Sequence, residues 1–167
     1  MALRRKPRPL IERTSEGFVV NMQREELDLL VRLLGELRGI LLSDDPRTAP
    51  LLRRLFPPAY HLADDAEAEA EYQRLMREDL VASRLDSIAG VEATLTSGTP
   101  MDDEGLQRFM QAVNAVRLVL GTLLDVGEEH DPTSVADDDP MVGEHHLYSF
   151  LSWILENTVQ ALMGQGT

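Results

Sequence analysis

The strongest hydrophobic pattern in the chain predicts a helix over residues 102–125. Apolar residues occur there on most sides of a helical projection, and the polar exceptions Asn114, Arg117 and Gly121 fall on one narrow stripe. A surface helix carries a single apolar stripe, whereas a helix that is apolar nearly all round is enclosed by other helices. We therefore expect this segment to be the central helix of an all-α bundle of about five to six helices.

Leucines in 3-4 spacing predict the first helix, over residues 23–42, with Asn21 as its N-cap. They are Leu27, Leu30, Leu34, Leu37 and Leu41. Such a seam packs either within one bundle or against a second copy of the chain, and both arrangements stay open. Gly35 and Gly39 would each destabilise a helix interior by about 1 kcal/mol relative to Ala, so we expect a neighbouring helix to approach closely there.

Further helices are expected at residues 47–56, 65–78, 79–96 and 143–163. The boundary near Glu78 and Asp79 is placed where the apolar stripe changes phase, because Tyr72, Leu75, Met76 and Leu80 form one stripe and later residues form another. In the last helix Trp153 points away from the buried stripe, so we expect it to be partly exposed.

Two short β-like runs around a turn cluster predict a small hairpin over residues 9–21. An isolated two-stranded hairpin is marginal in water, so it must lean on the helices or pair across a dimer. Residues 1–8 form a basic tail that we expect to be disordered, and residues 9–164 form a single helical domain.

Composition narrows the class of protein. The chain has 167 residues, 43% of them hydrophobic, and contains no apolar run long enough to span a membrane. The basic start lacks the apolar stretch of a secretory signal, which favours a cytoplasmic protein. With no cysteine, disulfides and thiolate chemistry within the chain are excluded.

The charge is unevenly distributed. The net charge is −13, yet five of the 16 basic residues and only one of the 29 acids fall in the first 13 positions. The acidic body repels phosphates, which argues against direct nucleic-acid binding. The basic tail is either solvated or contacts an acidic partner.

One cluster raises the alternative of a metal-dependent hydrolase. It lies in and beside an acidic stretch and comprises His130, Asp131, Asp137, Asp138, Asp139, His145 and His146. Imidazole and carboxylate groups are suitable ligands for a divalent ion, but the spacing matches no established metal motif. The chain also lacks the glycine-rich phosphate loops and the nucleophile elbow of common enzyme classes. We therefore favour a non-enzymatic protein and predict no catalytic, cofactor or metal site.

Four residues are candidates for contact with a protein partner. Phe56 and Tyr60 belong to the proline-stiffened run LFPPAY, which either docks another chain or covers the end of the bundle. Trp153 is the expected exposed aromatic residue. Arg117 lies in an apolar helix, so it needs a carboxylate or carbonyl partner unless it faces solvent or another chain.

Four stretches together resemble one family. They are LFPPAY at residues 55–60, EAEAEYQRLMREDL at 67–80, NAVRLVLGTLLDV at 114–126 and YSFLSWILENTVQAL at 148–162. In order and spacing they are similar to an actinobacterial family of unknown function that is typically encoded near the Clp protease adaptor. Some members are described as oxidative-stress regulators that act on transcription through a sigma factor.

The resemblance implies a mostly helical, non-enzymatic domain with no cofactor. It also implies a protein partner, such as a sigma factor, RNA polymerase or a Clp-related protein, and a homodimer is a further alternative. Redox sensing by cysteine pairs is not available to this chain. A regulatory role would therefore depend on binding another protein, or the signal would be sensed elsewhere.

Overall fold

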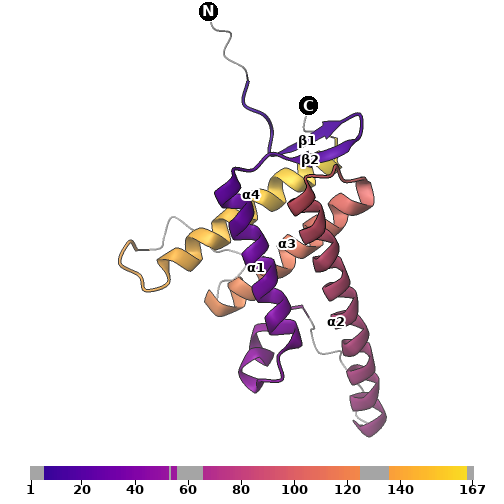
Figure 1. The fold of residues 1–167 in the computed structure, drawn as a ribbon. Helices are drawn as coiled ribbons and strands as arrows, with labels where there is room; N and C mark the ends of the chain where they lie inside the picture. The colour runs from indigo at the N-terminus through magenta and orange to yellow at the C-terminus, as the bar shows by residue number, and fades with distance from the viewer. Residues whose placement is uncertain (1–5, 53, 56–65, 125–135, 165–167) are drawn as a thin grey trace, which may run out of the picture.

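The computed structural model describes residues 6–52, 54–55, 66–124 and 136–164 (Figure 1). The elements in chain order are β1 (Ile11–Thr14), β2 (Gly17–Val20), α1 (Arg24–Leu42), the 3₁₀ helix η1 (Pro46–Leu52), α2 (Ala66–Ser97), α3 (Asp103–Leu124) and α4 (Val142–Leu162). The prediction of a mostly helical bundle with a small N-terminal hairpin is confirmed.

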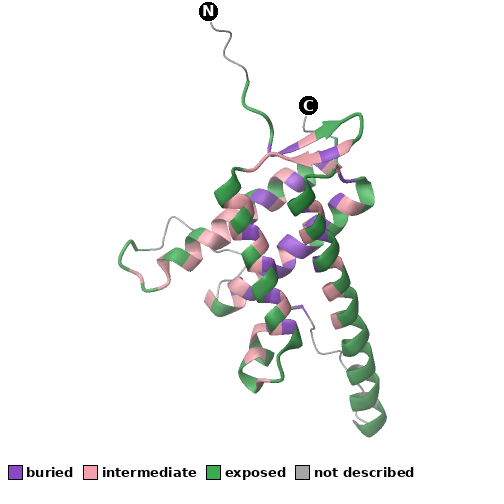
Figure 2. Ribbon diagram, viewed as in Figure 1, coloured by how far each residue is buried: buried purple, intermediate pink, exposed green. Residues whose placement is uncertain are grey.

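Helix α3 lies at the centre of the bundle, as its apolar pattern predicts. It contacts α1, α2, α4 and η1. Leu106, Phe109 and Val113 are fully buried in it, and Leu30 of α1 and Ile154 of α4 are buried equally deeply (Figure 2). The core is therefore a single cluster built around α3, to which every other described helix contributes.

The leucine seam of α1 belongs to this core. Leu30, Leu34, Leu37 and Leu41 are all buried within the chain. The reading of the seam as a surface for self-association is therefore wrong for these four positions, because their side chains are already covered.

Two details predicted for α1 are also wrong. The N-cap is Gln23, whose backbone N–H donates to the Glu26 carboxylate, while the Asn21 amide donates to Pro9 O and Glu12 Oε2 at the base of the hairpin. A side chain at Gly35 or Gly39 would meet no atom within 4 Å. No neighbouring helix approaches these glycines among the described residues.

The hairpin is anchored within the chain. Its strands pair antiparallel with Thr14 opposite Gly17, and Phe18 forms a second antiparallel bridge to Met101 in the α2–α3 connection. The two backbone hydrogen bonds of that bridge are 2.7 and 2.8 Å long. Gly17 has φ +130°, and a Cβ there would lie 2.5 Å from the Met101 carbonyl oxygen, so glycine is required at this contact. Of the two predicted supports for the hairpin, packing within the chain is the one observed.

The segment predicted as a helix over residues 47–56 is instead a 3₁₀ helix, η1, that ends at Leu52. Pro50 lies inside it and has no amide hydrogen, and its ring would clash with the carbonyl four residues earlier in an α-helix. The segment therefore takes the tighter helix, which is used in short pieces. Phe56 and Tyr60 lie outside the described residues.

Candidate interaction surface

Helix α2 is one continuous helix of 32 residues, so the predicted break near Glu78 and Asp79 is wrong. The change of stripe phase that suggested the break is real. Counting about 100° per residue, the stripe of Tyr72, Leu75, Met76 and Leu80 lies roughly 140° around the axis from the later stripe. A single helix with no internal proline carries both stripes, on nearly opposite faces.

The two stripes have different surroundings. The later one packs into the bundle against α1 and α3 and comprises Val81, Leu85, Ile88, Val91 and Leu95. The earlier one lies on residues 66–80, which we call the arm, because this half of α2 runs beyond the other helices (Figure 1). Every described side chain from residue 67 to residue 80 is exposed (Figure 2).

Four apolar side chains of the arm are therefore in contact with water. Tyr72 is 57% exposed, and Leu75, Met76 and Leu80 are also exposed. We call these four residues the arm stripe. Scattered apolar residues on a surface need no explanation, but a contiguous row on a projecting helix is typical of an interaction site. The four residues are spaced three, one and four positions apart, which is typical of an amphipathic helix that binds in the hydrophobic groove of a partner.

Acidic residues surround the arm stripe. The arm carries five acids and two arginines, namely Glu67, Glu69, Glu71, Glu78, Asp79, Arg74 and Arg77. Arg74 forms an exposed ion pair with Glu71 at 3.2 Å. The net charge of the arm is therefore negative, and a surface that complements it carries Lys or Arg around an apolar centre.

Arg117 is held between α3 and α4. Its guanidinium donates to Asn114 Oδ1 at 3.1 Å and to the Tyr148 hydroxyl at 3.4 Å, and it lies 5.6 Å from the centre of the Tyr148 ring. The Asn114 oxygen is an amide carbonyl, which is one of the two kinds of partner expected from the sequence, whereas no described carboxylate forms an ion pair with Arg117. The contacts give Arg117 a role in fastening α4 to the central helix.

Trp153 is 46% exposed, which confirms the expectation that it points away from the buried stripe of α4. Its ring stacks on Phe150, with 6.2 Å between ring centres. Trp153 is thus one of several exposed apolar side chains outside the arm, together with Leu42, Leu123, Val159 and Met163.

The described residues of the histidine and aspartate cluster do not gather into a metal site. Asp137, Asp138 and His146 are exposed, and Asp139 Oδ1 accepts the backbone N–H of Met141 at 2.8 Å next to the start of α4. Within the described ranges no group of three or more His, Cys, Asp or Glu residues could hold a metal ion. His130 and Asp131 lie outside those ranges.

Sequence reasoning missed the arm as a surface. The phase shift in α2 was its signal, since a helix with apolar stripes on opposite faces has two surfaces to cover. Among the described residues, no helix is long and apolar enough to cross a membrane.

Comparison with known proteins gives one match. Neither the curated proteins nor the solved structures include a significant match to this chain. A family model described as a domain of unknown function, DUF2017, matches residues 6–162, which include the hairpin and every helix that the structure describes. The chain therefore belongs to the DUF2017 family.

Proposed function

We propose that this protein is a non-enzymatic interaction module that binds a protein partner through the arm stripe. The observation that supports this most directly is the exposure of Tyr72, Leu75, Met76 and Leu80 on a helix half that leaves the bundle. Most helical stability in proteins comes from packing an apolar face, and the described side chains in this half of α2 are all exposed, so they show no such packing. A partner that covers the stripe would supply it.

The charge of the arm indicates the chemistry of the partner. An apolar groove or helix rimmed by Lys and Arg would complement the acids beside the stripe, mainly raising the association rate and the specificity. Pairing of two arms from two copies of this chain is disfavoured, because it would bring two acidic surfaces together and the whole chain carries −13. A different protein is therefore the partner we propose.

The resemblance to stress regulators narrows the class of partner. On that basis we propose a cytoplasmic regulator of transcription that acts through a sigma factor, RNA polymerase or a Clp-related protein. Trp153 on α4 is a second contact candidate, because it too is exposed.

Affinity capture from a lysate of the source organism tests the arm. The variant Leu75→Gln/Met76→Gln removes two stripe residues and keeps good helix formers. The matched control Leu42→Gln/Met163→Gln removes the same two residue types from exposed positions at the ends of α1 and α4. Circular dichroism verifies that both variants fold.

A protein retained by the wild type and the control, and lost from the arm variant, would support the proposal. Equal retention by the arm variant would contradict it. Adding Trp153→Ala as a third variant would show whether α4 contributes to the same contact.

A further inference from the structure

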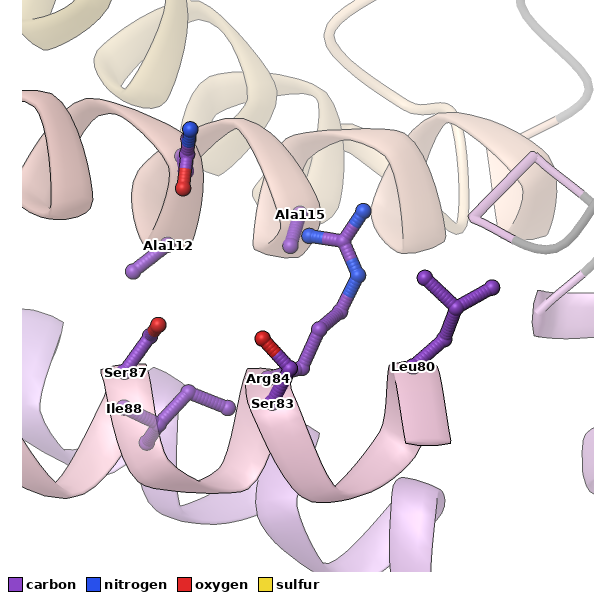
Figure 3. Close-up of a pocket in the computed structure, with 8 residues that line it drawn as sticks. Leu80, Ser83, Arg84, Ser87, Ile88, Ala112 and Ala115 are labelled. Carbon is purple, nitrogen blue, oxygen red and sulfur yellow. The ribbon is translucent and has the colours of Figure 1, made fainter. Parts of the chain in front are cut away.

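A cleft of about 280 Å³ lies between α2 and α3 at the base of the arm. Figure 3 shows Leu80, Arg84 and Ser87 on α2 facing Ala112 and Ala115 on α3. The two alanines are small, so they leave room between the helices. The Arg84 side chain extends across this room toward α3.

Arg84 lacks, among the described residues, the carboxylate partner that Arg38 and Arg108 have. Arg38 is paired with Glu92, and Arg108 with Glu104. No described carboxylate lies within ion-pairing distance of Arg84, and its Nε is buried without a hydrogen-bond partner among the described residues. Burial lowers the pKa of this guanidinium from its ordinary value. An unpaired, partly buried cation is costly, and an anion from outside the chain would relieve that cost.

The other polar groups of the cleft suit the same ligand. Ser83 and Ser87 carry hydroxyl groups, and Gln111 carries an amide, so each can donate a hydrogen bond to an anion beside Arg84. Among the described residues that line the cleft there is no acid. The remaining surface is apolar and includes Ile88, Ala112 and Ala115, which are all buried.

We propose that this cleft binds a carboxylate attached to a short apolar group. The guanidinium of Arg84 would hold the carboxylate in the two-pronged geometry that suits planar anions, and the apolar group would lie on the alanines of α3. A single cation in a chain of net charge −13 matches a monoanion better than a dianionic phosphate. The cleft volume of about 280 Å³ lies just below the usual range for ligand pockets, about 300–1,000 Å³, so the ligand is small.

Two sources supply this chemistry, a free small carboxylic acid and the carboxyl terminus of a peptide. NMR titration of the ¹⁵N-labelled full chain distinguishes them. Hexanoate and 3-phenylpropanoate represent the free acids. Acetyl-Ala-Leu represents the peptide carboxyl terminus, and its C-terminal amide is the control. Hexan-1-ol tests the apolar group without the charge, and inorganic phosphate tests the charge without the apolar group. We expect saturable shifts in residues 83–88 and 111–115, with a Kd of about 1 mM or tighter for at least one carboxylate.

Arg84→Gln should raise the Kd for that carboxylate about tenfold or more. Arg32→Gln, which removes the same charge from an exposed position on α1 outside the cleft, should leave its Kd unchanged. Hexan-1-ol, the peptide amide and phosphate should not bind. These three controls use the wild-type chain, so the test does not depend on whether the Arg84 variant folds. Absence of saturable shifts with every carboxylate would overturn the proposal, as would binding of hexan-1-ol or phosphate equal to that of hexanoate.

Discussion

One pair of substitutions on α2 tests whether the arm is free of the bundle. Leu75 and Leu95 are on the same helix, but Leu75 is 51% exposed and Leu95 is 5% exposed. Replacing each with Ala removes the same atoms and keeps a good helix former, so the two variants differ mainly in what surrounds the side chain.

The burial sets the expected magnitudes. Leu95→Ala removes a side chain packed into the core and should lower the free energy of unfolding by about 2–5 kcal/mol. Leu75 already exposes half of its side chain, and Ala has the higher helix propensity, so Leu75→Ala should change the free energy of unfolding by less than about 1 kcal/mol.

Urea unfolding followed by far-UV circular dichroism measures both effects. With a slope of about 2 kcal/mol per M, a loss of about 3 kcal/mol for Leu95→Ala moves the midpoint down by about 1.5 M, whereas Leu75→Ala leaves it nearly unchanged. If Leu75→Ala lowered the midpoint as far as Leu95→Ala, the arm would pack on the bundle, and the reasoning that leaves its stripe free for a partner would be refuted.

Three further predictions concern two glycines and the carboxylate of Asp45. Gly39→Ala should raise the free energy of unfolding by up to about 1 kcal/mol, because a side chain there meets open space in a helix interior. Gly17→Ala should lower it by about 1–3 kcal/mol, because φ is +130° and the added Cβ meets the Met101 carbonyl; unfolding curves test both glycines. The side-chain hydrogen bond from Arg47, followed by its backbone N–H, lowers the pKa of Asp45 below 3.8, so this contact stabilises the fold above that pH and is lost as pH falls through the lowered pKa. NMR titration of the Asp45 carboxyl should show the low pKa, and Arg47→Gln should raise it toward 3.8.

The sequence was sufficient to predict those helices and strands whose hydrophobic pattern is compatible with only one structure. The all-round apolar character of residues 109–124 can be satisfied only inside other helices, and α3 lies there. The hairpin followed from its two runs and turn, while its support by Met101 did not, since that contact joins segments far apart in the chain.

The failures at the predicted break in α2 and at Gly35 and Gly39 share one cause, which is that a local pattern does not say what lies opposite it. The phase shift in α2 fits either two helices or one helix with two surfaces, and only the packing against α1 and α3 decides. Glycine at positions 35 and 39 is compatible with a closely packed neighbouring helix or with an open helix face, and the structure has the open face. Arg84 is inconspicuous in a chain rich in acids, because its lack of a described acidic partner is a property of the folded arrangement.

The most direct test of the arm as a docking surface is the Kd of the captured partner for the wild type and for Leu75→Gln/Met76→Gln. Each side chain is about half exposed, so covering it contributes about 1 kcal/mol, and losing both should raise the Kd about 30-fold. The control Leu42→Gln/Met163→Gln should leave the Kd within about twofold of the wild type. An unchanged Kd for the arm variant, with its fold intact, would show that the partner binds elsewhere.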